Sequence, residues 1–286
     1  MGIALALGTF DGLHTGHMSV INSALQSGFE SIAVIFADPP AASLLNKEHA
    51  NILDAQFKIK LLKQLGFSDV IVLDFAKVKD IEATEFLENL VKQFNPKKIC
   101  CGFNYTFGKD KRGNVTVLEK FCKDRKIELS VSQNVTSEGI SISSTYIRSL
   151  IGKGNVKKAN TFLKVPFGFC AEVLHGDERG RTIGFPTINQ VYPKNLVLPR
   201  FGVYASRCTV NEKEYNAITN IGLRPTFKTE QVTAETHILD FNEDLYAQKI
   251  CVTLDEFLRD EICFENIDAL KNQISLDIKT AFGGEK

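Results

Sequence analysis

A short segment near the start of the chain, GTFDGLHTGH from Gly8 to His17, combines glycines with two histidines. Gly8 and Gly12 allow the backbone to approach a ligand closely, and the free N–H groups in the first turn of a following helix attract an anion. His14 and His17 are three residues apart and can face the same point on a helix. This set is suited to stabilising the charge that develops on phosphate oxygens during nucleotidyl transfer from ATP.

Two other interpretations of this segment stay open from the residues alone. A glycine-rich turn that carries two surface histidines would have the same composition, and a motif by itself is only a hypothesis. A zinc site would need further ligands, and the neighbouring sequence supplies only Asp11. We therefore rank the zinc site below the other two interpretations.

Two later segments strengthen the phosphate interpretation. SISSTYIR, from Ser141 to Arg148, places hydroxyls at a predicted helix start with an arginine on the next turn. Taken alone, this segment is better explained as an N-cap followed by an exposed arginine. Together with the histidine segment, however, it indicates a second phosphate-binding surface. GFNYTFG, from Gly102 to Gly108, follows a predicted strand and so lies where open α/β sheets bind ligands.

A different set of residues occurs in the second half of the chain, in the segment from Gly176 to Asn189. It joins three glycines and two arginines to Pro-Thr-Ile-Asn, and it is not a Walker A loop. Glycines let the backbone approach phosphates closely, and an arginine is able to bind two phosphate oxygens at once with a pair of hydrogen bonds. Thr187 and Asn189 offer hard oxygen donors that suit Mg²⁺. A surface hairpin rich in turn residues is the alternative.

Glu235 is the candidate general base for phosphorylating an alcohol. Within the stretch from Val232 to Leu239, side chains of a strand alternate between two faces, so Glu235 shares its face with Thr233 and His237. A carboxylate there is able to accept a hydroxyl proton as the oxygen attacks the γ-phosphorus of ATP. Exposed glutamates are common on strands, so the residue type alone supports this role weakly.

The elements that must position these residues differ between the two halves of the chain. In the first half, short apolar runs alternate with helical patterns. The runs predicted to be strands are Ile3–Leu7, Ser31–Phe36, Asp69–Leu73 and Lys98–Cys101. Strand and helix in alternation predict a parallel sheet covered on both faces, a Rossmann-like α/β domain.

The second half predicts an all-β domain with one closing helix. Short strands with turn signals are expected at Gly202–Val210, Glu214–Ile221, Thr233–Phe241 and Lys249–Leu254, and a helix at Ile267–Phe282. We interpret this half as a small β-barrel with a C-terminal helix. The expected boundaries are a first domain over 1–154, a linker helix over 155–165 and a second domain over 166–286.

Composition is typical of a globular enzyme. The 286 residues include 34 basic and 34 acidic side chains, and this zero formal charge argues against a surface devoted to nucleic acid. Most of the seven cysteines are expected to be reduced core residues, because no CxxC pair occurs. Neither a signal peptide nor a membrane span is predicted, so a cytoplasmic protein is expected. The oligomeric state is not predicted.

At almost full length the chain resembles the bacterial bifunctional riboflavin kinases and FAD synthetases. GTFDGLHTGH is similar to that family's nucleotidylyltransferase signature, and SSTYIR to its second one. The Pro-Thr-Ile-Asn run resembles the family's Pro-Thr-Ala-Asn element, and the segments from Asn220 to Phe227 and from Glu235 to Phe241 also match. The resemblance implies phosphorylation of riboflavin to FMN in the second domain and adenylylation of FMN to FAD, with release of pyrophosphate, in the first.

The resemblance also implies roles for individual residues, with Mg²⁺ as the metal, ATP, riboflavin and FMN as substrates and FAD as the product. Catalytic roles fall on His14, His17, Arg148 and Glu235. The ATP site of the adenylyltransferase is expected at Gly8, Thr9, Phe10, Asp11, Gly12, His14, His17, Asn104, Ser144, Thr145 and Arg148. The ATP and flavin site of the kinase is expected at Gly176, Arg179, Gly180, Arg181, Gly184, Pro186, Thr187, Asn189 and Arg224, with Mg²⁺ on Thr187 and Asn189.

One departure from the family pattern bears on the substrate. The family shows Phe, an acid, Pro, His and Pro after its second strand, whereas this chain reads FADPP from Phe36 to Pro40, without the histidine. Two rival functions remain: an adenylyltransferase for another phosphorylated metabolite, because histidine sites of this type serve several substrates, and a flavin-binding or regulatory protein without turnover, which the missing histidine favours. The presence of the second domain argues against the first rival.

Overall fold

The computed structural model describes residues 2–36, 50–175, 183–225 and 230–283. Its contacts divide the chain into two compact units, Met1–Tyr146 and Ile147–Lys286. The division falls inside helix α6 (Ser144–Gly152), and the short helix α7 (Val156–Asn160) follows it and packs on strand β13 (Lys249–Arg259) of the second unit. Each unit is described by itself below.

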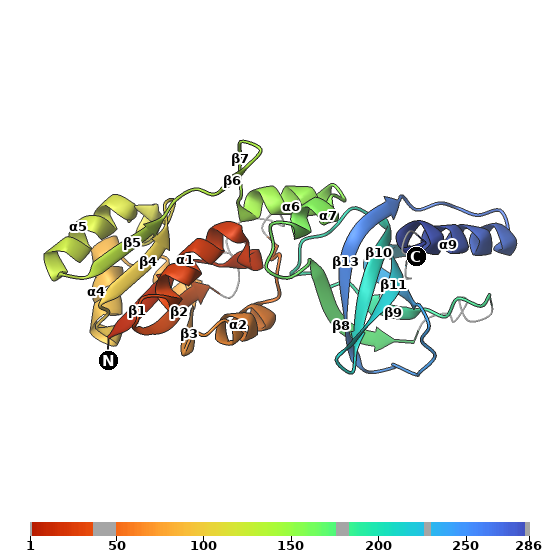
Figure 1. Ribbon diagram of the computed structural model, residues 1–286, viewed down its shortest axis with the longest axis horizontal. Helices are drawn as coiled ribbons and strands as arrows, with labels where there is room; N and C mark the ends of the chain where they lie inside the picture. Colours follow the sequence, from red (N-terminus) through yellow and green to blue (C-terminus); the bar gives the residue numbers. More distant parts are fainter. Residues whose placement is uncertain (1, 37–49, 176–182, 226–229, 284–286) are drawn as a thin grey trace. The chain divides into compact units, whose positions relative to one another are not determined.

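The first unit is built on a five-stranded parallel sheet with the order β3-β2-β1-β4-β5 (Figure 1). The strands are β1 (Ile3–Leu7), β2 (Glu30–Phe36), β3 (Asp69–Leu73), β4 (Lys98–Gly102) and β5 (Glu128–Ser132). The main helices are α1 (Thr15–Leu25), α2 (Ala55–Gln64), α4 (Ala83–Phe94) and α5 (Val115–Arg125), with the short α3 (Phe75–Val78). The predicted α/β domain with a parallel sheet is confirmed.

Helices cover both faces of this sheet because its central strand is apolar on both sides. Leu5 and Leu7 of β1 share a buried cluster with residues of α4 and α5. The alternate residues of β1, Ala4 and Ala6, are fully buried, and α1 contacts β1, β4 and β5. Small side chains at these positions let α1 approach closely, which holds its N-terminus at the carboxyl end of β1.

The second unit is a closed antiparallel barrel with the strand order β10-β11-β12-β9-β8-β13 (Figure 1). Its strands are β8 (Gly168–Leu174), β9 (Ile188–Val191), β10 (Gly202–Val210), β11 (Lys213–Pro225), β12 (Glu230–Ile238) and β13. Closure leaves each strand paired on both sides, which removes exposed edges. The predicted small β-barrel is therefore confirmed.

The interior of the barrel contains polar as well as apolar side chains. Ser206, Thr219 and Thr236, all fully buried, form a chain of hydroxyl hydrogen bonds across β10, β11 and β12, with oxygen–oxygen distances of 2.8 and 2.9 Å. Ser206 also donates to the Ala217 carbonyl at 2.9 Å. Each of the three buried hydroxyls thus has a partner, as a low-dielectric interior requires.

The predicted C-terminal helix, α9 (Ile267–Phe282), is held to the barrel by an ion pair. Asp277 is the buried residue of this helix, and its carboxylate accepts hydrogen bonds from the Arg259 guanidinium at 2.7, 2.9 and 3.1 Å. Gln273 donates to the same carboxylate at 2.8 Å. Because Arg259 ends β13, the pair fixes the helix to the end of that strand.

The cysteines largely follow the expectation of reduced core residues, with one exception. Free thiols are buried at Cys100, Cys101, Cys122 and Cys208, and Cys263 is free and exposed. Cys170 and Cys251 instead form a disulfide between β8 and β13, where they stand directly opposite each other. They are 81 residues apart in the chain, so only the pairing of the two strands reveals their proximity.

Candidate active sites

The first candidate site lies in the loop after β1. At this edge of the sheet, the connections that leave neighbouring strands run in opposite directions. β1 pairs with β2 on one side and with β4 on the other, so the loops after β1 and β4 leave the sheet at adjacent carboxyl ends. This is the topological switch point at which open α/β sheets bind ligands. Gly8 begins one loop and Asn104, which is exposed, lies in the other.

The backbone of the first loop is tightly folded around Phe10. This residue has φ of 48° and ψ of 31°, the left-handed region that an aromatic residue rarely adopts, and its side chain is 1% exposed. Its ring lies against Gly8, where a Cβ would be 2.8 Å from a ring carbon. Gly12 follows within the short helix η1 (Asp11–Leu13) with φ of 81°. Both glycines are thus required by the local backbone, as a close turn demands.

The two histidines are brought together at the start of α1. His14 is the N-cap of the helix, and its Nδ1 accepts the His17 N–H at 3.4 Å. The two rings stack with their centroids 3.6 Å apart, and the edge of Phe10 packs against His17 at 5.5 Å. His14 is 5% exposed. The imidazoles therefore lie together at a helix N-terminus, where the helix dipole favours an anion.

Asp11, expected at the ATP site, has a structural role in this geometry. Its carboxylate accepts the Ile52 N–H at 2.9 and 3.1 Å and the Leu53 N–H at 3.2 Å, and the residue is 1% exposed. These bonds direct the carboxylate at the backbone just before α2. In the described part of the chain no group of three or more His, Cys, Asp or Glu side chains is placed to hold a metal ion.

The start of α6 reaches the same loop. The Ser144 hydroxyl donates to the Asp11 carbonyl at 3.1 Å, and the Ser143 hydroxyl accepts the Tyr146 N–H at 3.2 Å. Thr145 is exposed on the first turn, and Arg148 follows Ser144 by four residues on the same helix. The hydroxyls are thus placed beside the histidine loop although 133 residues separate Ser144 from Asp11.

Sequence reasoning missed Lys58, a charged residue of α2 that is 1% exposed. Its ammonium donates to the Thr9 carbonyl at 3.1 Å and to the Phe36 carbonyl at 2.8 Å. A signal was present, because Lys58 occupies the same helical face as the buried Leu62, four residues later. A lysine on the apolar face of a helix indicates a buried cation with partners.

The second candidate site lies on the outer face of the barrel. Ala234, Thr236 and Ile238 of β12 are buried, whereas Glu235 and His237 between them are partly exposed. In register, Glu235 stands opposite Asn189 of β9 and opposite Asn220 of β11. Directly opposite residues of antiparallel strands have Cβ atoms about 5 Å apart on the same face. The carboxylate of Glu235 therefore lies between two amide side chains.

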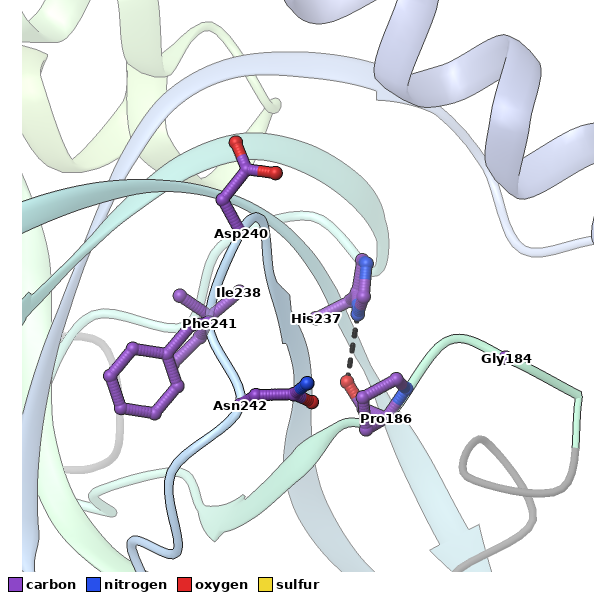
Figure 2. Close-up of a pocket in the computed structure, with 7 residues that line it drawn as sticks. All are labelled: Gly184, Pro186, His237, Ile238, Asp240, Phe241 and Asn242. Carbon is purple, nitrogen blue, oxygen red and sulfur yellow. Dashed lines mark hydrogen bonds between the residues drawn. The ribbon is translucent and has the colours of Figure 1, made fainter.

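The Pro-Thr-Ile-Asn segment is attached to this face through His237 (Figure 2). The His237 ring forms a hydrogen bond with the Pro186 carbonyl at 2.8 Å, and Phe185 packs edge-on against it at 5.4 Å. Thr187 follows and leads directly into β9 with Asn189. An open pocket of about 480 Å³ adjoins this contact. Its lining residues are Gly184, Pro186, His237, Ile238, Asp240, Phe241 and Asn242.

Several residues assigned to the second site from sequence cannot be placed. Gly176, Arg179, Gly180 and Arg181 lie outside the described residues. Arg224 lies on β11, and its side chain is likewise outside what the structure describes.

Glu261 is a neighbour of the second site that sequence reasoning did not single out. It accepts a hydrogen bond from the Asn220 amide at 3.1 Å. Its carboxylate lies against Gly222, where a Cβ would be 2.2 Å from the nearer oxygen. No periodicity in the sequence connects Glu261 with Asn220, because Asn220 lies in β11 and Glu261 follows β13.

Comparisons with known proteins match each unit separately. A family model described as FAD synthetase matches residues 1–146, and one described as riboflavin kinase matches residues 163–282. The described residues include no helix that is long and apolar enough to cross a membrane.

Full-length relatives match both units together. The bifunctional riboflavin kinase/FMN adenylyltransferase of Bacillus subtilis is 33% identical over 97% of this chain and 90% of its own length. Its Escherichia coli counterpart is also 33% identical, over 98% and 92%. A crystal structure from Streptococcus pneumoniae, titled a macrolide-efflux protein, superposes with a TM-score of 0.90 at 31% identity over 99% of this chain and 94% of its own. The chain belongs to the bifunctional riboflavin kinase/FMN adenylyltransferase family, with its FAD synthetase part first and its riboflavin kinase part second.

Proposed function

We propose that this chain makes FAD in two steps: it phosphorylates riboflavin to FMN at the barrel and adenylylates FMN to FAD at the parallel sheet. The observation that supports this most strongly is the full-length similarity to bifunctional relatives, combined with one candidate phosphate site in each unit. The adenylyltransferase is assigned to 1–154 and the kinase to 166–286, joined through 155–165.

At the first site, the backbone of Gly8, Thr9, Phe10 and Gly12 together with the first turn of α1 forms the phosphate cradle. The stacked His14 and His17 stabilise the charge on the α-phosphate as the FMN phosphate attacks it and pyrophosphate leaves. Ser144, Thr145 and Arg148 supply further donors from α6, and Asn104 contributes from the loop after β4. Asp11 anchors the cradle to the chain before α2 through its bonds to Ile52 and Leu53.

At the second site, Glu235 accepts the proton of the riboflavin hydroxyl that attacks the γ-phosphorus. Asn189 lies opposite Glu235, and Thr187 is two residues before Asn189, so two hard oxygen donors are available beside a carboxylate. This donor set fits Mg²⁺, which keeps several waters and takes few protein ligands. When bound, the ion neutralises charge on the phosphates of ATP. Gly176, Arg179, Gly180, Arg181, Gly184, Pro186 and Arg224 complete the proposed nucleotide and flavin site.

A product assay tests both reactions at once. Incubation of the chain with riboflavin, ATP and Mg²⁺ should yield FMN and then FAD, and incubation with FMN and ATP should yield FAD and pyrophosphate, both resolved by chromatography. Adenylyl transfer that uses neither FMN nor riboflavin would indicate another phosphorylated substrate. Flavin binding without any product would indicate a protein that has the fold and lacks turnover.

The setting that we propose for these reactions is the cytoplasm, with small molecules as partners. The balanced count of 34 basic and 34 acidic residues gives no net attraction to nucleic acid or to an anionic membrane. FMN carries a phosphate, and riboflavin receives one from ATP. Local hydrogen-bond donors, rather than the overall charge of the protein, would therefore bind these phosphates.

A further inference from the structure

Lys58 and Asp11 tie the start of α2 to the loop after β1 in a reciprocal arrangement. The Asp11 side chain of the loop accepts the backbone N–H groups of Ile52 and Leu53. In the other direction, the Lys58 side chain of α2 donates to the backbone carbonyl of Thr9. Both charged residues are 1% exposed. Burying a charge is costly unless it is well partnered, so this pair of contacts is a specific feature of the loop.

The contacts of Lys58 and Asp11 bracket the strained residue of the loop. Phe10 has a left-handed backbone, which costs an aromatic residue about 1–3 kcal/mol unless its surroundings impose it. The peptide before it is held by Lys58 through the Thr9 carbonyl, and Asp11 directly after it is anchored through its carboxylate. Removing the ammonium would release the first of these two restraints.

The same ammonium contacts one side of a peptide group of the loop. The structure has no cis peptide bond among the described residues, so the Thr9 carbonyl and the Phe10 N–H point in opposite directions. With the carbonyl turned towards Lys58, the N–H is turned away from it. Lys58 also donates to the Phe36 carbonyl at the end of β2 at 2.8 Å, which links the carboxyl ends of two neighbouring strands.

We propose that Lys58 is a positioning residue for adenylyl transfer: through the Thr9 carbonyl it sets the conformation of the loop that leads to His14 and His17. The residue does not contact the reacting atoms, since protein atoms cover it. This inference rests on the proposed function of the first unit. A displaced loop should slow the chemical step, because a shift of about 1 Å in a catalytic group lowers the rate by up to about 100-fold.

The test uses the full chain with two substitutions at Lys58 and one matched control. Lys58→Met keeps the length of the side chain and removes the charge, and Lys58→Arg keeps a buried cation. Lys60→Met removes an exposed lysine from the same helix. For each variant kcat and KM are measured for FAD formation from FMN and ATP, and riboflavin phosphorylation is measured on the same preparation as an internal reference.

The expected result is specific to one parameter of one reaction. Lys58→Met should lower kcat for FAD formation about 100-fold with KM for FMN within about threefold of wild type, because positioning acts on the chemical step. Riboflavin phosphorylation and Lys60→Met should stay within about twofold of wild type, and Lys58→Arg within about tenfold. A folded Lys58→Met chain with unchanged kcat would overturn the proposal.

Two remaining outcomes are also decisive. If Lys58→Met does not fold, Lys58→Arg decides: a folded chain that keeps FAD formation supports the need for a cation, and failure of both variants beside a folded Lys60→Met assigns Lys58 to stability alone and refutes positioning. If wild type itself forms no FAD, the proposed function is wrong. Wild-type turnover with an unaffected Lys58→Met variant refutes only this inference.

Discussion

The two candidate phosphate sites of this chain are built on different kinds of scaffold. The first is assembled from loops at the ends of parallel strands, and the second from side chains on the outer face of antiparallel strands. In the first, the buried charged side chains of Asp11 and Lys58 make hydrogen bonds on either side of Phe10, whose backbone is left-handed. In the second, register alone places Asn189, Glu235 and Asn220 side by side. Strands position side chains directly, whereas loops need a supporting shell.

The largest effect that would sharpen this comparison is expected at Glu235. Glu235→Gln removes the proposed base and keeps the size of the side chain, so riboflavin phosphorylation should fall by about 10²–10⁴, the usual contribution of a general base. FAD formation from supplied FMN should be unaffected, because that reaction is assigned to the other unit. Steady-state rates of both reactions check this. Retained kinase turnover would remove Glu235 from the role of base.

The reverse experiment acts on His14. His14→Ala should reduce FAD formation by about 10²–10³, the usual cost of losing one group that stabilises transition-state charge. FMN formation should survive. His14→Asn is the matched control for the helix cap, because asparagine also accepts the hydrogen bond of an N-cap and lacks the imidazole. If Asn restored full FAD formation, His14 would be a cap and not a catalytic group, and equal loss of both activities would contradict the division of labour.

A smaller effect, on stability, is expected in the barrel unit. Asp277→Asn breaks the buried ion pair that holds α9, in which Arg259 and Asp277 expose 18% and 5% of their side chains, and should cost about 3 kcal/mol. Asp260→Asn is the control, because its pair with Arg200 is exposed and should be worth less than about 1 kcal/mol. Denaturant unfolding, followed by loss of riboflavin phosphorylation, measures both. Equal effects would mean that burial does not decide the strength of these pairs.

The smallest expected effect is a difference between the two units in how their stability depends on pH, which comes from their buried thiols. Burial raises the pKa of Cys101 to about 12 and of Cys122 to about 11, and it also raises that of Cys100, all in the first unit. The second unit has Cys208, with a pKa raised to about 12 by burial. The thiol is the form favoured by folding, so this stabilisation is complete below pH 9, the ordinary thiol pKa, and is lost as pH rises towards 11–12.

By pH 10 the loss should be on the order of 1 kcal/mol for Cys101 in the first unit and for Cys208 in the second, and Cys100 and Cys122 add to the loss in the first unit only, so the first unit should lose more than the second. Thermal inactivation of FAD formation should therefore shift further between pH 8 and pH 10 than that of riboflavin phosphorylation. Cys263→Ser serves as the control, since Cys263 is exposed and should not alter the difference. Parallel shifts of the two activities would show that the thiols do not distinguish the units.

Much of the fold was predictable because the local pattern agreed with the final environment. The strands expected at 3–7, 69–73 and 202–210 and the helix at 267–282 have those bounds in the structure. β5 was not predicted, because its sequence Glu-Leu-Ser-Val-Ser lacks the continuous apolar run by which the other strands of this half were identified, and pairing with β4 places it in the sheet. β11 runs beyond the predicted 214–221, since its length depends on partners in β10 and β12.

The candidate sites were predictable to different extents. The residues of the histidine loop are adjacent in sequence, so their spacing indicated a shared site, and burial of alternate residues along β12 agrees with the expected face of Glu235. The environment of Asp11 was not predictable, because its partners Ile52 and Leu53 are 41 and 42 residues away. The partners of Glu261 and Lys58 could not be found for the same reason.

By itself, the sequence determined the class of each domain and the residue types that are able to bind phosphate, since periodicity and short motifs are local properties. The tertiary structure decided which groups meet. It stacked His14 on His17, placed Glu235 between two asparagines, brought Lys58 to the Thr9 and Phe36 carbonyls and joined Cys170 to Cys251. These contacts depend on strand order and register, which arise when distant segments pack to bury their apolar faces.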